Sequence, residues 1–269
     1  MKTVELAVKI AKEAGTELAK QIDNSFNIEQ KKSSFDLVTE WDKNTEHFIK
    51  ESIKQKYPDH EVIGEESISN ESNISLTNKL NNKSNIWVID PIDGTSNYVH
   101  GLPGYTISIA LLKKGELSLG VVYDPHNDEM FYAEKSRGAF LNNKKINVSN
   151  QADLISSIIA TGFPSEVSKH RVPVLNQIKQ IGTSCHNIRV YGSAALHCAY
   201  VAAGRLEAYW EPGLNIWDIA AGALIVKEAG GKVSEMDGEK FSYEFGSFLC
   251  TNGRVDNEMI RHFNSITSK

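Results

Sequence analysis

Apolar side chains recur every three or four positions along residues 3–22, with lysine and glutamate side chains between them. This spacing is typical of an amphipathic helix that buries one face. A second stretch of the same kind covers 42–56 and stops before Pro58, which cannot continue a helix. The N-terminal pattern therefore predicts two helices, each with an apolar face that must pack against another element.

Short apolar runs separated by turn residues follow, and these runs predict strands. The expected extended segments cover 37–39, 61–64, 86–89, 104–112, 116–123, 130–134, 138–141 and 145–148. Because tight turns join the later runs, they are expected to form an antiparallel meander. Residues 69–85 are rich in Asn and Ser and predict a surface loop, either a lid beside a site or a solvated spacer.

The pattern changes near residue 150, where predicted strands begin to alternate with predicted helices. The expected strands are 155–161, 187–191, 206–210, 232–235 and 247–251, and the expected helices are 174–181, 194–203, 217–229 and 255–266. Such alternation indicates a layered α/β arrangement. We therefore divide the chain into an N-terminal α+β half (1–148) and a C-terminal α/β half (149–269). The pattern leaves open whether the halves form one continuous body.

Composition narrows the class of protein. The chain has 269 residues, a formal charge of −5 and no basic run, so nucleic acid is not an expected general partner. Charges among the first twenty residues argue against a secretory signal, and no apolar stretch approaches the ~20 residues that span a bilayer. Three widely spaced cysteines fit neither a disulfide framework nor a zinc site. We expect a cytoplasmic protein with reduced thiols and no membrane partner.

Two carboxylates stand at the end of the apolar run 86–89. Asp90 ends this run, and Asp93 follows Pro91, a residue expected to end the strand because it cannot donate to a ladder. Strand ends held by a sheet often carry chemistry. Taken alone, Asp90 and Asp93 are explained as well by a helix cap and an ordinary Asp-Gly turn as by a functional site.

Further acids occur at other predicted strand ends and helix starts, at Glu65, Asp218, Asp36 and Asp42. Singly, each has an ordinary explanation: Glu65 suits a solvated acid, Asp218 suits a partner of the helix dipole, and Asp42 suits an N-cap. Together they would repel, since two like charges ~4 Å apart cost about 4 kcal/mol at an effective dielectric near 20. Either their pKa values rise or a divalent cation lies among them. Without His or Cys at ligand spacing, Mg²⁺ is favoured over Zn²⁺, and such a site suits phosphoryl chemistry.

The motifs around these acids resemble those of a known family. The three principal ones are Gly64-Glu65-Glu66-Ser67, Trp87-Val88-Ile89-Asp90-Pro91-Ile92-Asp93-Gly94-Thr95 and Trp217-Asp218-Ile219-Ala220-Ala221-Gly222. They resemble, in order, the signatures of the inositol monophosphatase family, and matches at Asp36-Leu37-Val38-Thr39 with Asp42 and at Gly192-Ser193-Ala194 extend the resemblance over nearly the whole chain. It implies an α-β-α-β-α sandwich, with an antiparallel meander sheet in the N-terminal half and a smaller mixed sheet in the C-terminal half.

The resemblance also implies metal ligands. Glu65, Asp90 and the Ile92 carbonyl would hold one Mg²⁺, and Asp90, Asp93 and Asp218 would hold a second. Glu65 would reach a third, weaker ion through water. Mn²⁺ is an alternative cation, whereas Li⁺ and Ca²⁺ are expected to inhibit.

The remaining roles concern the reaction itself. The implied catalytic residues are Glu65, Thr95 and Asp36, with Thr95 paired to Asp36 to activate a water for direct in-line attack on phosphorus. The implied substrate-binding residues are Asp93, Gly94, Thr95, Ser193, Ala194, Glu211 and Asp218. The family is usually homodimeric, so a homodimer is expected here.

The motifs define the phosphate end of a substrate and leave its alcohol open. Inositol monophosphate is the first expectation. NADP(H), fructose 1,6-bisphosphate, a 3′-phosphoadenosine nucleotide and histidinol phosphate are alternatives with the same chemistry. An alternative of another class is a regulatory protein that binds RNA or the transcription machinery. The negative net charge and the full set of acids argue against that as the main role.

Overall fold

The computed structural model describes residues 2–22, 28–30, 37–68, 85–164, 169, 171–242 and 246–267. Asp36 and nearly all of the Asn- and Ser-rich stretch 69–85 lie outside the described residues. No helix among the described parts of the chain is long and apolar enough to cross a membrane.

The N-terminal half is built on a mixed sheet that, within the described residues, has seven strands in the order β3-β4-β5-β6-β7-β8-β9. The strands are β3 (Glu61–Gly64), β4 (Asn85–Asp93), β5 (Thr106–Lys113), β6 (Glu116–Asp124), β7 (Glu129–Glu134), β8 (Ala139–Leu141) and β9 (Lys144–Ile146). From β4 onward each neighbour is antiparallel, as the meander prediction requires, whereas β3 runs parallel to β4. A separate antiparallel pair joins β1 (Ile28–Gln30) and β2 (Leu37–Thr39).

Strand β4 is buried on both faces, and its alternating side chains enter two different cores. Trp87 and Ile89 pack in the cluster formed with the outer helices α1 (Thr3–Gln21) and α2 (Glu40–Lys56). Ile86 and Val88 pack in the cluster formed with α7 (Ala194–Ala202) and α8 (Ile216–Glu228). This explains why β4 is a continuous apolar run, and it holds the strand end in a rigid position.

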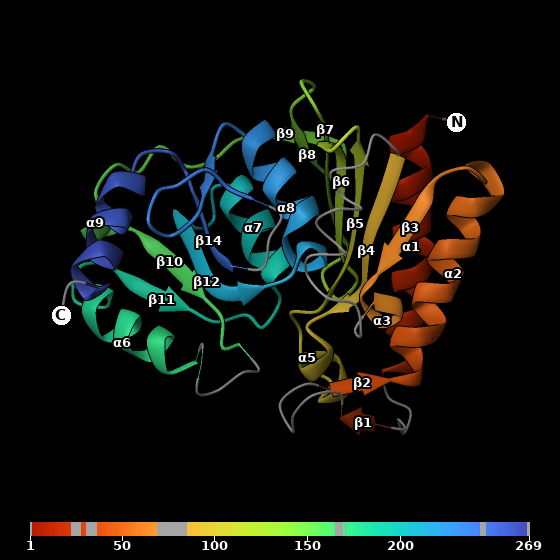
Figure 1. The fold of residues 1–269 in the computed structure, drawn as a ribbon, viewed down its shortest axis with the longest axis horizontal. Helices are drawn as coiled ribbons and strands as arrows, with labels where there is room; N and C mark the ends of the chain where they lie inside the picture. Colours follow the sequence, from red (N-terminus) through yellow and green to blue (C-terminus); the bar gives the residue numbers. More distant parts are fainter. Residues whose placement is uncertain are drawn as a thin grey trace.

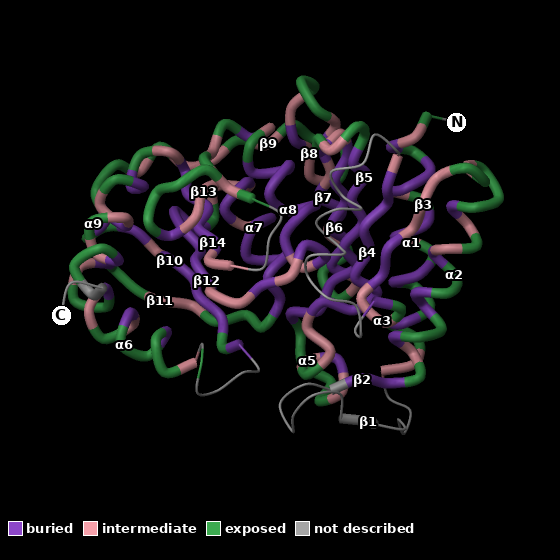
Figure 2. The backbone as a smooth tube through the Cα atoms, in the orientation of Figure 1, coloured by how far each residue is buried: buried purple, intermediate pink, exposed green. Residues whose placement is uncertain are grey.

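A second mixed sheet lies on the far side of α7 and α8 (Figure 1). Its order is β11-β10-β12-β14-β13, with β10 (Ile158–Thr161), β11 (Asn187–Arg189), β12 (Ala208–Leu214), β13 (Lys232–Ser234) and β14 (Gly246–Thr251). The short helix η1 (Leu154–Ser156) precedes β10. Helices α6 (Val172–Ile181) and α9 (Asp256–Thr267) cover its outer face. The predicted α-β-α-β-α sandwich is confirmed, and Figure 2 shows that its buried residues concentrate in the two sheets and the helices between them.

Two local predictions were wrong, and two short helices were not predicted. Strand β4 continues through Pro91 to Asp93 because a register shift between Asp90 and Asp93 removes the need for a ladder hydrogen bond there. Helix α2 begins at Glu40 with Thr39 as its N-cap, so Asp42 is not the cap. The short helices α3 (Glu65–Ile68) and α5 (Thr95–Val99) were not predicted, since four or five residues carry too little periodicity.

Candidate functional site

The irregular end of β4 presents two buried carboxylates. Asp90 is 2% exposed and Asp93 is 8% exposed. The Ile92 N–H donates to Asp90 Oδ1 at 3.0 Å, which fixes the turn of the backbone at the bulge. The register shift therefore places Asp90, the Ile92 carbonyl and Asp93 at one end of the sheet, next to the start of α5.

The hydroxyl of Thr95 lies between two acceptors. Its Oγ1 is 3.1 Å from Asp42 Oδ1 and 3.0 Å from the Ile92 carbonyl oxygen. Because a hydroxyl has one proton, it donates to only one of them at a time. The other oxygen of Asp42 accepts from the Thr39 N–H at 2.7 Å and the Thr39 hydroxyl at 2.6 Å. Asp42 is thus a buried carboxylate held in place by the start of α2 and aimed at Thr95.

The sequence placed Asp42 among the candidate acids but gave no sign that it pairs with Thr95. Asp36 lies outside the described residues, so its pairing with Thr95 stays a prediction, whereas the contact that the structure gives Thr95 is with Asp42. The available signal was the capping-box spacing of Thr39 and Asp42, which places an acid at the third helical position rather than at the cap.

Asp93 connects the end of β4 to the start of α7. Its Oδ2 accepts from the Ser193 hydroxyl and from the Ala195 N–H, both at 2.6 Å, at the start of α7. Ser193 also caps α7 by accepting from Leu196 N–H at 3.1 Å. Burial raises the pKa of Asp93 to about 6; hydrogen bonds from Ser193, Ala195 and Ala194 oppose this rise, and the charge of Glu65 adds to it. The predicted residues Ser193 and Ala194 therefore lie at Asp93.

Two further acids lie within electrostatic reach. Asp218 is in the first turn of α8, where its Oδ2 accepts from the Asn215 N–H at 2.7 Å. Burial, followed by the charges of Asp93 and Glu65, raises the pKa of Asp218 well above its ordinary value. On β12, Glu211 accepts from the Tyr209 hydroxyl at 2.7 Å, and burial raises its pKa to about 8, with a further contribution from Asp93.

These acids are suited to a divalent cation. In the described part of the chain, no group of three or more Asp, Glu, His or Cys side chains is already close enough together to hold a metal ion. The charges of Glu65 and Asp93 nevertheless act on Asp218, and that of Asp93 acts on Glu211. Buried like charges of this kind take up protons or a cation. A donor set of carboxylates with a backbone carbonyl fits a hard ion such as Mg²⁺.

Beside the acids, a tightly packed glycine begins α5. Gly94 has φ 98°, and a Cβ there would lie 2.7 Å from the Gly104 carbonyl oxygen and 3.2 Å from that of Gly192. The Asn97 side chain joins the same backbone segments, since its Nδ2 donates to the carbonyl of Gly104 at 2.8 Å and to that of Tyr191 at 2.6 Å. Glycine is therefore required at position 94 by its positive φ and by the close packing of the Gly104 and Gly192 backbone.

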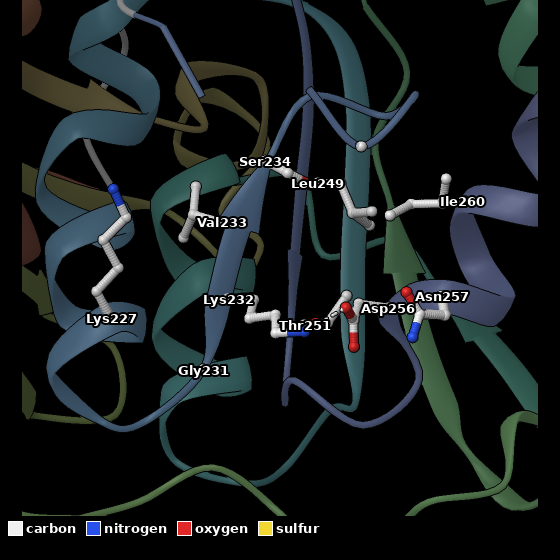
Figure 3. A pocket seen from close by; sticks show the side chains of 11 residues that line it. Lys227, Gly231, Lys232, Val233, Ser234, Leu249, Thr251, Asp256, Asn257 and Ile260 are labelled. Carbon is white, nitrogen blue, oxygen red and sulfur yellow. Dashed lines mark hydrogen bonds and ion pairs between the residues drawn. The ribbon is translucent and has the colours of Figure 1, made fainter. Parts of the chain in front are cut away.

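A hollow of about 390 Å³ lies elsewhere, between the end of α8, β13 and the start of α9 (Figure 3). Apolar side chains of Val233, Leu249 and Ile260 line it, and Lys232 Nζ donates to Asp256 at 2.7 Å. None of the predicted site residues lines this hollow. The predicted site residues therefore lie apart from this hollow.

Comparison with known proteins agrees with the fold and with the motifs. Residues 1–268 match the inositol monophosphatase family. A Nus factor SuhB of Pasteurella multocida is 39% identical over 256 residues, which are 95% of this chain and 93% of the relative. A fructose-1,6-bisphosphatase/inositol-1-monophosphatase of Thermotoga maritima is 35% identical over 269 residues, 100% of this chain and 98% of the relative.

A solved structure extends the agreement to three dimensions. The chain superposes on an IMPase from Thermotoga maritima with a TM-score of 0.88 and 35% identity, covering 100% of this chain and 99% of that one. The match covers the whole length of the chain in both sequence and structure. The chain belongs to the inositol monophosphatase family.

Proposed function

We propose that this protein is a Mg²⁺-dependent phosphomonoesterase of small phosphate monoesters, with inositol monophosphate as the first expected substrate. The observation that carries the proposal is the Thr95–Asp42 hydrogen bond beside the group of buried acids at the end of β4. A hydroxyl aimed at a buried carboxylate is a means of moving a proton, and the acids beside it suit a cation.

Five residues would hold the metal ions. Glu65, Asp90 and the Ile92 carbonyl would hold one, and Asp90, Asp93 and Asp218 would hold the other. When bound, Mg²⁺ would supply positive charge that makes a water more acidic and stabilises charge on the phosphate and the leaving oxygen. The pKa values of Asp93 and Asp218, raised by burial and by neighbouring charge, support this assignment, because a cation would relieve that repulsion.

The chain's own residues would orient the substrate and move the proton. Thr95 Oγ1 would accept the proton of the attacking water while its own proton passes to Asp42 Oδ1. The N–H groups of Gly94 and Thr95 would bind phosphate oxygens. Glu211 would hydrogen-bond hydroxyls of the alcohol, with Ser193 lining that side. The water would displace the alkoxide in line, without a phosphorylated enzyme, and solvent water would protonate the alkoxide to the alcohol.

A substrate panel tests this proposal. Phosphate release would be measured with inositol 1-phosphate, fructose 1,6-bisphosphate, NADP, a 3′-phosphoadenosine nucleotide and histidinol phosphate, in Mg²⁺ with and without Li⁺. Release that needs Mg²⁺ and falls with Li⁺ is expected, and the preferred substrate identifies the alcohol. No release from any member of the panel would overturn the proposal.

A regulatory binding role is the second candidate, because relatives at 39% identity are named Nus factors. The phosphatase-inactive variant Asp93→Asn separates the two roles. If binding to RNA or to the transcription machinery were the main role, that variant would restore cells lacking the protein as well as the wild type does. The expected homodimer is checked independently by sedimentation equilibrium.

A further inference from the structure

Helix α2 directs a second buried acid, one turn after Asp42, at another part of the candidate site. Glu46 is 4% exposed. Its Oε2 accepts from the Glu66 N–H at 2.7 Å, and its Oε1 accepts from the Ser67 hydroxyl at 2.6 Å and from Lys50 Nζ at 2.8 Å. Lys50 also donates to Ser67. The Glu46 carboxylate therefore accepts hydrogen bonds from the first turn of α3, and a lysine on its own helix neutralises its charge.

The same carboxylate lies directly against the end of β3. A Cβ added to Gly64 would be 2.3 Å from both Cδ and Oε2 of Glu46, so only glycine fits there. The Ser67 hydroxyl has two possible acceptors: Oε1 of Glu46 lies 2.6 Å away and the Gly64 carbonyl oxygen lies 3.2 Å away. Its single proton is therefore best placed on Glu46, and the short contact closes a compact turn.

Glu65 lies between these two fixed points. Gly64 before it packs against the Glu46 carboxylate, and the N–H of Glu66 after it donates to that carboxylate. The backbone on each side of Glu65 is thus held by one buried side chain. A partner that orients a ligand in this way typically affects metal affinity by about 10- to 100-fold.

We propose that Glu46 is a positioning residue that sets Glu65 toward a bound Mg²⁺. This inference rests on the proposed function. A purely structural role for Glu46 predicts a lower melting temperature with unchanged metal affinity. A positioning role predicts weaker Mg²⁺ binding even in protein that is fully folded.

The test compares Glu46→Gln with the matched control Glu51→Gln, which changes an exposed acid on the same helix. Gln keeps an acceptor for the Glu66 N–H but loses the charge that holds Lys50 and Ser67. Isothermal titration with Mg²⁺, without substrate, is expected to give about tenfold weaker binding for Glu46→Gln and no change for Glu51→Gln. The Mg²⁺ concentration for half-maximal activity should rise by the same factor, while kcat at saturating Mg²⁺ recovers.

Ser67→Ala provides a milder variant in case Glu46→Gln folds poorly. It removes one contact of Glu46 and should weaken Mg²⁺ binding by a smaller factor, with circular dichroism and melting in EDTA close to wild type. Wild-type Mg²⁺ affinity in folded Glu46→Gln and Ser67→Ala would overturn the role of Glu46 alone. A wild-type protein that binds no Mg²⁺ would instead overturn the proposed function, and this inference with it.

Discussion

Replacing Asp42 by Asn separates the two tasks of its carboxylate. Asp42 accepts hydrogen bonds from the N–H and the hydroxyl of Thr39 on one oxygen and from the hydroxyl of Thr95 on the other. An amide has only one acceptor atom, so Asn can serve Thr39 or Thr95 but not both. If its oxygen faces Thr39, its NH₂ group faces Thr95 and leaves the hydroxyl proton without a base.

The size of each effect follows from these contacts. Loss of a general base lowers kcat by about 10²- to 10⁴-fold, which corresponds to roughly 3–5 kcal/mol of barrier. Loss of a hydrogen bond to a charged group lowers the free energy of unfolding by about 2 kcal/mol. For a chain of this size, that is a fall in melting temperature of roughly 4–8 °C. Asp42→Asn should therefore be modestly less stable and far less active.

The assay measures kcat at saturating Mg²⁺ and unfolding in urea, for Asp42→Asn and for Thr39→Ala. Thr39→Ala removes the N-cap hydroxyl of α2 and should cost about 1 kcal/mol of stability, while Asp42 still faces Thr95. It should keep most of its kcat. The general-base role of Asp42 is refuted if Asp42→Asn turns over within threefold of wild type. It is also refuted if Thr39→Ala loses as much kcat, because the effect would then come from the start of α2.

Three other predictions follow from the acids and one buried histidine. Asp93→Asn should abolish Mg²⁺-dependent turnover with unchanged circular dichroism; near-normal activity would contradict its role. Burial raises the pKa of Glu211 from 4.5 to about 8, so the unfolded state loses this proton at a lower pH than the folded state, and stability falls as pH rises from 4.5 to about 8. In urea unfolding, Glu211→Gln should therefore gain roughly 2–3 kcal/mol relative to metal-free wild type as pH rises from 6 to 8, and a difference that stays constant over this range would contradict this. Burial lowers the pKa of His197 to about 3, so this histidine is neutral in the folded state, whereas it takes up a proton in the unfolded state below pH 6.5. The stability that the neutral imidazole contributes is therefore complete above pH 6.5 and falls by about 1.4 kcal/mol per unit as the pH drops from 6.5 towards 3. His197→Gln should lessen that acid loss in unfolding between pH 7 and 5; an unchanged pH dependence would count against it.

The sequence was most informative where one element satisfied a strong pattern by itself. The apolar run 86–89 predicted a strand, and alternate residues of β4 enter two cores. The amphipathic spacing of 3–22 predicted α1, and alternation after residue 150 predicted the second sheet with its helices. The layered fold could be predicted because each of these elements buries a face that only another layer can cover.

Prediction failed where the deciding contact joins residues far apart in the chain. Asp42 and Thr95 are 53 positions apart, and a local reading of Asp42 found only a helix start. Pro91 breaks an ordinary ladder, but the register shift in β4 removes that constraint. The resemblance supplied roles for individual acids, yet it paired Thr95 with Asp36 and gave no role to Glu46. Spacing alone does not tell which carboxylate a folded hydroxyl faces.

Helix α2 explains how the site can be built from segments that the sheet alone would not align. Strands β3 and β4 lie side by side and parallel, with Gly64 opposite Ile89, so the sheet brings Glu65 and Asp90 to the same edge. The two strands end differently: helix α3 follows β3 directly, whereas β4 continues through its bulge. Asp42 and Glu46, four positions apart, lie on one face of α2 and bind the start of α5 and of α3, respectively. One rigid helix therefore sets both turns, and the spacing between Thr95 and Glu65 depends on α2 as much as on the strands.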